Sequence, residues 1–561
     1  MHASLVVKNA KVVTVDSSFS IQEAIAVDGD TIVAVGSNGD VEGLIGPETR
    51  VLDLEGKTIL PGANDGHGHP ALFGGTRPPL AMDLYAPRIS DAAGVAAEVK
   101  EWVARTPPGT WIRGFGWDPQ LIPNPSRFDL DAVSPDNPLA LSDWTAHSVW
   151  VNSLALRLAG VTKDTPDPEG GAIERDPATG EPTGVFRELS AIGLIMKVVP
   201  LLTKEEKREA ILSAMATMNA NGITSYTDSA LGAGGNTYSG GLLSQDCADV
   251  YVDLHREGKM TARLTVLALF GEYGAISMAD LERGMQEYAW PQGLDPNWLR
   301  FPGVKIFADG IPFSKTSAMW EEYEDGGFGT FAIPGATEEE KQDRLMAMVR
   351  HVCSKRLQVG VHVTGDRAAS VALDALEAAI AADPAVAETR PYLIHANQIR
   401  DSDLVRAGRL GIGINMQPTI QSIIADMLPV FFGAERTARD WPFAGALKAG
   451  VRLGASSDLP VTYPNWREGV QAMVLREGVP SGKVSGPEEC IGIEDAIRAY
   501  TINGAWQDHM DDVKGSIEVG KLADFCVLDA DILTVEPHTI KDIAVVTTIV
   551  GGVVVYDATG E

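Results

Sequence analysis

Two histidines separated by a single glycine, His67-Gly68-His69, are the first residues of this chain with an obvious chemical use. They end the run Thr58–Gly66, which reads as a strand that passes into a loop. In an extended chain, residues i and i+2 project to the same face, so both imidazoles can reach one metal ion. Imidazole nitrogen is a common ligand of Zn²⁺ and neighbouring first-row ions. The alternative is two unrelated polar residues in a glycine-rich loop.

Further residues of the same chemical kind lie inside expected strands or at their carboxyl ends. They are Lys305, His362, His395 and Asp458. Lys305 lies within the apolar strand 303–307, where an inward amine is costly unless it is neutralised or paired. Taken singly, each has a purely structural explanation, such as a hydrogen-bonded core histidine or a helix-capping aspartate. Taken together with the histidine pair, they predict a metal centre.

Alternating strands and helices between residues 203 and 455 are expected to carry these side chains. Thr203–Asn221 predicts a helix, with Thr203 as N-cap and Glu206 completing a capping box. Repeated strand–helix units predict a parallel sheet, either a closed (β/α)8 TIM barrel or an open doubly wound sheet. Barrel enzymes place their active sites at the carboxyl ends of the strands, where the candidate ligands fall.

The two ends of the chain have a different pattern, with short strand-like segments separated by turn signals. Gly551-Gly552 predicts one hairpin turn. We therefore expect a small β-sandwich domain built from both termini, residues 1–57 plus 512–561, around a barrel at 58–511. Residues 76–202, rich in Pro, Trp and turn signals, are expected to form a long insertion in this α/β protein.

Composition restricts the class of protein and its partners. Of 561 residues, 45% are hydrophobic and 22% charged, as in soluble globular proteins, and the formal net charge is −30. That charge disfavours nucleic acid and anionic membranes as partners. Four widely spaced cysteines and an N-terminus without a secretion signal predict a cytoplasmic protein. Assembly into a homo-oligomer stays open.

The chain resembles the amidohydrolase superfamily. The segments that carry the resemblance are Leu60-Pro61-Gly62 with Asp65-Gly66-His67-Gly68-His69, Gly303–Gly310, Val361–Ala368, Ile394-His395-Ala396, Ser457–Val461 and Gly515–Asp524. Within the insertion, Gly116-Trp117-Asp118 and Ala146–Ser153 are similar to the amidohydrolase family 3 branch, which includes N-substituted formamide deformylases.

The resemblance implies one or two divalent ions, with Zn²⁺ as the default. His67, His69 and Asp458 would hold one ion, His362 and His395 the other, and a carboxylated Lys305 would bridge them. The implied partner is a small-molecule substrate, and the implied reaction is hydrolysis of its C–N bond, in an amide or an N-substituted formamide, by metal-activated hydroxide. Asp458 would act as general base and then as general acid.

Four other residues are candidates for contact with substrate: Trp117, His147, Asp309 and Trp320. Three alternatives stay open. The same barrel can run a metal-dependent decarboxylase, lyase or isomerase reaction, or a non-catalytic assembly protein can have kept it. The third is a nucleotide-binding open sheet, which the missing G-x-G-x-x-G and G-x-x-x-x-G-K-[ST] motifs disfavour.

Overall fold

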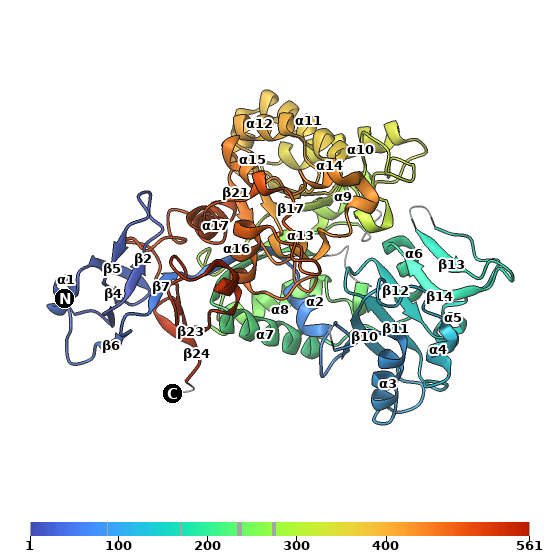
Figure 1. The fold of residues 1–561 in the computed structure, drawn as a ribbon, viewed down its shortest axis with the longest axis horizontal. Coiled ribbons are helices and arrows are strands. Elements are labelled where there is room, and N and C mark those ends of the chain that lie inside the picture. Colours follow the sequence, from blue (N-terminus) through green and yellow to red (C-terminus); the bar gives the residue numbers. More distant parts are fainter. Residues whose placement is uncertain (1, 87, 169–170, 233–237, 272–275, 560–561) are drawn as a thin grey trace.

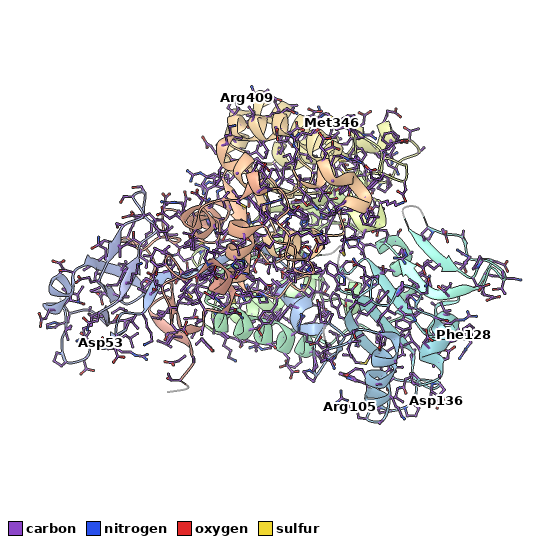
Figure 2. All side chains as sticks on the ribbon, viewed as in Figure 1. Asp53, Arg105, Phe128, Asp136, Met346 and Arg409 are labelled. Atoms are coloured by element: carbon purple, nitrogen blue, oxygen red, sulfur yellow. The ribbon has the colours of Figure 1, made fainter. Side chains whose placement is uncertain are left out.

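The structure, a computed structural model, describes residues 2–86, 88–168, 171–232, 238–271 and 276–559. Three parts lie side by side along its longest axis (Figure 1). A small β domain that contains both chain ends lies at the left of this view, a helix-covered barrel at the centre, and a third unit at the right. Asp53 of the first part and Phe128 of the third lie towards opposite ends of the molecule in Figure 2.

The central part is a parallel eight-stranded sheet in the order β21-β20-β19-β18-β17-β16-β15-β8. Its strands are β8 (Ala63–Gly68), β15 (Ile223–Leu231), β16 (Arg263–Ala268), β17 (Leu299–Phe307), β18 (Gln358–Val363), β19 (Tyr392–His395), β20 (Gly413–Met416) and β21 (Leu453–Ala455). Backbone hydrogen bonds join the first strand to the segment after the last, from Asp458 N to His67 O (3.0 Å) and from His69 N to Leu459 O (2.7 Å). The predicted barrel is confirmed, and the open doubly wound sheet is excluded.

Helices cover the outside of the barrel. The best predicted is α7 (Lys204–Ala220), where Thr203 and Glu206 form the expected capping box. α10 (Glu338–Ser354) begins in the same way, with Thr337 as N-cap and three glutamates in the first turn, where the helix dipole favours negative charge. The remaining helices around the barrel are α2 (Pro70–Gly75), α8 (Gln245–Arg256), α9 (Met278–Glu287), α11 (Asp366–Ala382), α12 (Asp401–Leu410), α13 (Pro418–Ile424), α14 (Pro429–Thr437), α15 (Phe443–Lys448), α16 (Trp466–Leu475), α17 (Ile493–Ala499) and α18 (Ile502–Gln507).

The terminal domain is a sandwich of two sheets, ordered β5-β4-β1-β6 and β24-β23-β22-β7-β2-β3. Its elements are β1 (Leu5–Lys8), β2 (Lys11–Val13), β3 (Ile21–Gln22), β4 (Ala24–Asp28), β5 (Thr31–Gly36), α1 (Asn38–Glu42), β6 (Arg50–Asp53), β7 (Thr58–Pro61), β22 (Phe525–Leu528), β23 (Val545–Val550) and β24 (Val553–Asp557). β7 pairs with β2 and with β22, so it joins the two chain ends. The N-terminal part of this domain therefore extends to Pro61 and not to residue 57. Gly551 and Gly552 form the expected turn, with φ of 57° and 76°.

The insertion has a sheet of its own, which the sequence did not predict. Six strands are ordered β13-β14-β12-β11-β10-β9. They are β9 (Met82–Asp83), β10 (Ile112–Trp117), β11 (Leu139–Asp143), β12 (Ser148–Val151), β13 (Ala172–Arg175) and β14 (Pro182–Arg187), with helices α3 (Ala92–Val103), α4 (Arg127–Asp131), α5 (Ser153–Ala159) and α6 (Leu189–Met196). In strands this short, separated by many turn residues, the alternation of apolar and polar residues is too brief to predict a strand from the sequence. The unit buries two apolar clusters of its own, so it is a packed module at the mouth of the barrel.

All four cysteines are free thiols, and three of them are buried. Across the described residues, no helix combines the length and apolarity that a membrane crossing requires.

Candidate metal centre

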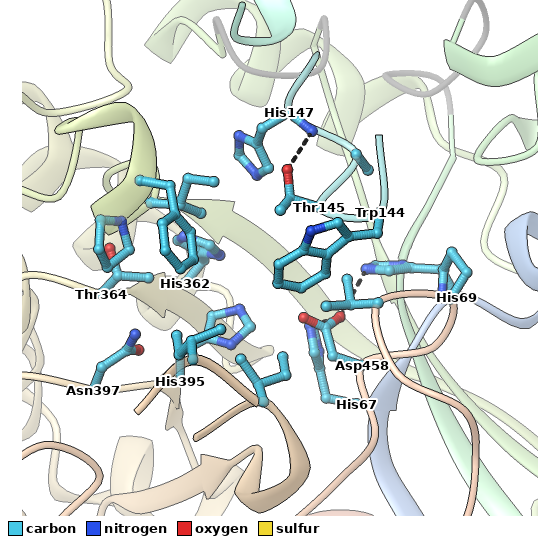
Figure 3. Close-up of a pocket in the computed structure, with 18 of the residues that line it drawn as sticks. His67, His69, Trp144, Thr145, His147, His362, Thr364, His395, Asn397 and Asp458 are labelled. Atoms are coloured by element: carbon cyan, nitrogen blue, oxygen red, sulfur yellow. Dashed lines mark hydrogen bonds and ion pairs between the residues drawn. The ribbon is translucent and has the colours of Figure 1, made fainter. Parts of the chain in front are cut away.

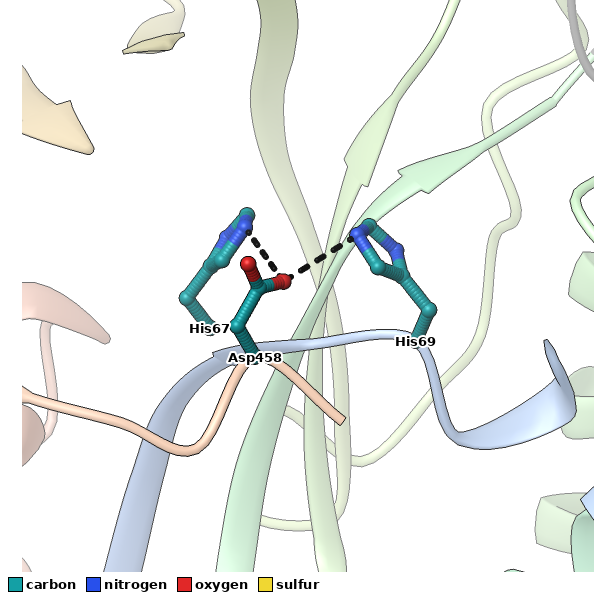
Figure 4. A group of neighbouring side chains, drawn as sticks. All are labelled: His67, His69 and Asp458. Atoms are coloured by element: carbon teal, nitrogen blue, oxygen red, sulfur yellow. Dashed lines mark ion pairs between the residues drawn. The ribbon is translucent and has the colours of Figure 1, made fainter. Parts of the chain in front are cut away.

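Closure of the barrel brings the His67-Gly68-His69 pair against Asp458. Asp458 Oδ1 lies 3.3 Å from His67 Nε2 and 3.7 Å from His69 Nε2 (Figure 4). One ligand atom from each residue lies within 4.8 Å of the other two, and all three residues are buried. Two neutral imidazoles and a carboxylate at this spacing are suited to holding one divalent ion.

His362 and His395 extend the cluster along the inside of the barrel. The His395 ring lies 5.2 Å from the His67 ring and 4.5 Å from the His362 ring, centroid to centroid. All the imidazoles of the predicted set therefore line one cavity together with Asp458 (Figure 3). Each comes from the carboxyl end of a strand or from the loop directly after it, as barrel geometry requires.

Polar side chains behind the histidines fix which ring nitrogen faces the cavity. Ser229 Oγ lies 2.5 Å from His67 Nδ1, and Gln417 Oε1 lies 2.6 Å from His395 Nδ1. Those contacts leave Nε2 of each ring available to an ion. On His362 the roles are reversed, because Nε2 lies 3.1 Å from the carbonyl oxygen of Gly310 and Nδ1 is left available. Such outer partners orient the rings of metal ligands and raise their basicity.

Asp228 plays a similar part beside His69. Its Oδ1 lies 3.9 Å from His69 Nδ1, beyond hydrogen-bond distance but within electrostatic reach. Burial raises the pKa of Asp228, and contact with His69 partly opposes that rise. Asp228 therefore lies behind His69 and does not line the cavity.

Lys305 lies at the base of the cluster, with a side chain that is 1% exposed. Its Nζ has no hydrogen-bond partner among the described residues. Burial lowers the pKa of Lys305 to about 7, against the opposing charge of Asp458. Burial also lowers the pKa of His67, His362 and His395, and the charge of Lys305 contributes to the lowering in all three. The lysine is therefore electrostatically part of the histidine cluster.

The backbone at the site is tightly packed and partly strained. A Cβ added to Gly68 would lie 2.2 Å from Leu459 Cδ2, so a larger residue between the two histidines would require the buried Leu459 side chain to shift. Asp458 and His395 have φ of 55° and 73°, in the left-handed region that non-glycine residues rarely adopt. Strain of this kind persists where the surrounding structure holds a functional side chain in place.

The insertion forms part of the wall above the cluster. The cavity has a volume of about 810 Å³, and its upper wall includes Trp144 and His147 from the β11–β12 loop and Phe313 from the loop after β17. Trp144 and Phe313 meet edge to face, 6.3 Å between centroids. A second cavity of about 710 Å³ lies beyond His147 and shares that residue with the first.

The other residues predicted to contact substrate lie in different places. Trp117 is fully buried in the core of the insertion, where its Nε1 donates to the Leu141 carbonyl at 2.8 Å. Trp320 is 45% exposed on the outside, with Nε1 donating to Ser370 Oγ at 3.2 Å. Neither lines the cavity of the cluster.

Asp309 lies near the second cavity, but its carboxylate is already hydrogen-bonded to backbone N–H groups. Its carboxylate accepts from the N–H groups of Thr364, Gly365 and Ala318 at 2.8 to 2.9 Å. Burial raises the pKa of Asp309 to about 7, although these hydrogen bonds oppose the rise. The residue joins the loops that follow β17 and β18, which fixes its role as a positioning one.

Sequence reasoning missed the residues that hold the histidines. Asp228 and Ser229 lie near the carboxyl end of β15, so the strand-end rule that selected the ligands also applied to them. Gln417 follows β20 in the same way. Glu188, described below, had no such signal, because it lies in the insertion, for which no strands were expected.

The residues present suit a divalent metal. Four buried imidazoles and one carboxylate converge on a cavity, and the buried Lys305 Nζ and His69 Nδ1 lack hydrogen-bond partners among the described residues. Nitrogen and oxygen donors of this type suit Zn²⁺ and other first-row ions.

A family model described as "Amidohydrolase family" matches residues 50–556. Among curated proteins, the chain is 31% identical to Protein LONG AFTER FAR-RED 3 of Arabidopsis thaliana, over 99% of this chain and 92% of that protein. It is 30% identical to the N-substituted formamide deformylase of Arthrobacter pascens, over 99% of both chains.

Solved structures show the same fold. An uncharacterized metal-dependent hydrolase from Pyrococcus horikoshii OT3 superposes with a TM-score of 0.73 at 22% identity, covering 95% of this chain and 99% of its own. Atrazine chlorohydrolase TrzN from Arthrobacter aurescens TC1, complexed with zinc, has a TM-score of 0.52 at 13% identity, covering 99% of this chain and 95% of its own.

Proposed function

Because this chain belongs to the amidohydrolase family and is a hydrolase, we propose that it is metal-dependent and cleaves a C–N bond in a small amide or N-substituted formamide. The observation that carries the proposal is the position of Asp458 Oδ1, within 3.3 and 3.7 Å of two histidine nitrogens in one cavity. A carboxylate among buried imidazoles is the arrangement that a metal site and a general base both need.

The ligand set divides into two groups. His67, His69 and Asp458 would hold one ion, and His362 with His395 would hold a second. When bound, the metal supplies a Lewis acid that polarises the scissile carbonyl and lowers the pKa of water. The nitrogen and oxygen donors favour Zn²⁺. Other first-row ions also bind such donors.

Lys305 is proposed to join the two groups as a carbamate. Its Nζ is buried and has no hydrogen-bond partner among the described residues. Adding carbon dioxide to the amine would release one proton and leave an anionic carbamate with two oxygen donors. That change would remove a buried cation from among the histidines and supply a ligand that both groups could share.

Asp458 is proposed to move the protons. Its carboxylate accepts a proton from the attacking water and afterwards holds it for return to the products. Ser229, Gln417 and Asp228 keep the histidine rings in place during this exchange, and Trp144 and Phe313 restrict the access of bulk water.

Metal analysis of the purified protein, together with an amide screen, tests this function. We expect bound transition metal, and release of amine from N-substituted formamides or other small amides. Asp458→Asn should lower kcat/KM about 10²- to 10⁴-fold, the range for loss of a general acid–base. The control is Asp557→Asn, because Asp557 lies on β24 of the terminal sandwich, where its carboxylate accepts hydrogen bonds from Thr559.

Protein without transition metal, with activity that survives Asp458→Asn, would overturn the proposal. Carbon dioxide release from carboxylate substrates, without amine release from any amide, would favour the lyase or decarboxylase alternative. A cytoplasmic location and the absence of nucleic-acid or membrane partners stay predictions from the sequence, and the oligomeric state stays open.

A further inference from the structure

His147 and Glu188 form a closely joined pair in the wall of the cavity. His147 Nδ1 lies 2.8 Å from Glu188 Oε2, and the backbone N–H of Glu188 donates to the His147 carbonyl at 2.8 Å. Both side chains are largely buried, with exposures of 14% and 11%. His147 directly precedes β12 and Glu188 directly follows β14, so the antiparallel pairing of Ser148 with Arg187 brings the two residues together.

Glu188 is also held from the barrel side. Its Oε1 accepts a hydrogen bond from Thr316 Oγ1 at 3.0 Å, in the loop that follows β17. The residue has a φ of 64°, which is rare for a side chain of this size. A carboxylate fixed by the insertion and the barrel together, at the cost of backbone strain, indicates a positioning role.

The loop that carries His147 is equally well defined. Asp143 Oδ1 accepts from the Ser148 N–H at 3.0 Å, and its Oδ2 accepts from Thr145 Oγ1 at 2.7 Å. Thr145 Oγ1 in turn accepts from the His147 N–H at 3.2 Å. His147 therefore projects from the insertion into the cavity, on the opposite side from His395 and Asp458 in Figure 3.

The ring nitrogens of His147 have separate environments. Nδ1 is taken by Glu188, which leaves Nε2 as the nitrogen that can meet a substrate. Because His147 lines both cavities, a substrate bound over the histidine cluster would pass directly beneath it. Asp458 lies on the barrel wall and His147 on the insertion, so two proton-carrying groups face the cavity from different sides.

We propose that His147, positioned by Glu188, is the catalytic acid that protonates the leaving nitrogen of the scissile C–N bond. The inference rests on the proposed hydrolysis and adds a residue to it. Water loses a proton to Asp458 and its oxygen bonds to the carbonyl carbon, which gives a tetrahedral adduct. As the C–N bond breaks, nitrogen keeps the electron pair and takes the Nε2 proton of the imidazolium. This step leaves His147 neutral. The proton that Asp458 took from water then returns His147 to its imidazolium form.

The electrostatics of the pair agree with this role. Burial lowers the pKa of His147, but the charge and hydrogen bond of Glu188 outweigh it and leave the pKa above its usual value. Burial raises the pKa of Glu188, while His147 and the hydroxyls of Ser314 and Thr316 bring it below its usual value. The titratable groups around His147, in addition to Glu188, are Asp143, Asp458, His362, Asp309 and Lys341.

Leaving-group dependence separates an acid catalyst from a residue that only binds substrate. The probes are para-substituted formanilides, whose leaving anilines differ in basicity. We expect His147→Gln to lower kcat about 10²- to 10³-fold for the unsubstituted anilide, and much less for the nitro-substituted one, which needs little protonation. His351→Gln, on α10, is the matched histidine control and should leave the series unchanged.

Glu188→Gln tests the positioning residue through pH. The acid must be protonated, so the wild-type rate falls as pH rises through the pKa of His147. Loss of the Glu188 charge lowers that pKa, and the fall in kcat should therefore begin at a lower pH. The metal content of the variant should equal that of the wild type.

A second readout does not depend on turnover. Diethyl pyrocarbonate modifies neutral imidazole, and mass spectrometry resolves the modified residue. His147 should become reactive at a lower pH in Glu188→Gln than in the wild type, while the profile of His351 stays the same.

Three results decide the inference. An equal loss of rate across all formanilides in His147→Gln, with an unshifted pH profile in Glu188→Gln, overturns it. An unshifted modification profile overturns it for any substrate. If the wild type cleaves no formanilide while the modification profile shifts, the proposed amide substrate fails and the protonated pair is supported.

Discussion

Arg263 of the barrel and Asp524 of the terminal sandwich form a buried two-point ion pair. Arg263 Nε lies 2.6 Å from Asp524 Oδ2, and Nη2 lies 2.8 Å from Oδ1. The side chains are only 1% and 5% exposed. Arg263 is the first residue of β16, and Asp524 immediately precedes β22, so the pair joins the two domains at their contact.

Breaking this pair should destabilise the protein strongly. Asp524→Asn leaves the guanidinium buried without its counter-charge, and we expect a loss of about 3–5 kcal/mol. Urea unfolding followed by fluorescence checks this, with Asp280→Asn as the control, because its ion pair with Arg283 is more exposed. Equal midpoints for the two variants would contradict the structural role of the pair.

Lys305→Ala should lower metal content and activity together. The substitution removes the proposed bridging ligand and leaves the histidines without a shared anion. Small carboxylates such as acetate should restore part of the activity, since they can occupy the vacated space. Elemental analysis and assays with added carboxylate measure both effects, and Lys355→Ala, at the end of α10, is the control. Full metal occupancy with an unchanged rate would argue against any bridge.

Gln417→Ala should weaken metal binding, although Gln417 is not itself one of the proposed ligands. The glutamine holds His395 Nδ1, and its Nε2 donates to Ser456 Oγ at 3.0 Å, so the ring loses its orientation when the amide is removed. Loss of such a partner typically costs 10- to 100-fold in metal affinity. Competition with a chelator measures the affinity. Ser422→Ala, on α13, is the control, and an affinity equal to that of the wild type would show that His395 needs no support.

Gly68→Ala should weaken the site by forcing Leu459 to shift. The new methyl group meets Leu459 Cδ2 at 2.2 Å, and this fully buried side chain, next to Asp458, must move to make room for it. We expect lower metal content and lower activity, both measured on purified protein. Gly193→Ala is the matched control, because nothing lies within 4 Å of a Cβ at that helical position. Comparable metal content in the two variants would count against the importance of this contact.

The sequence predicted the barrel and the position of its candidate ligands because both follow from local pattern. Strand–helix alternation is visible along the chain, and residues such as His362 and His395 lie at strand ends, which meet at one rim in any parallel barrel. The capping box of Thr203 and Glu206 was readable for the same reason, since it spans only four residues.

The sequence did not predict features that depend on pairing between segments far apart along the chain. The contact of His147 with Glu188 spans forty-one residues and depends on the register of β12 against β14. Trp117 was a candidate for contact with substrate because it lies in the insertion. It lies on β10, inside the core of the insertion, with its ring centroid 5.9 Å from that of Trp150. Side-chain type alone does not distinguish a cavity wall from a core.

The hydrogen bonds between β8 and the segment after β21 have a consequence for synthesis of the protein. Asp65 and Ser457, which also bond across this seam, are 392 residues apart. A ribosome must therefore release most of the polypeptide before the two halves of the ligand set can meet. Chains that end before Asp458 will lack the complete proposed ligand set, so metal uptake would report that the barrel has been synthesised through its last strand and has closed.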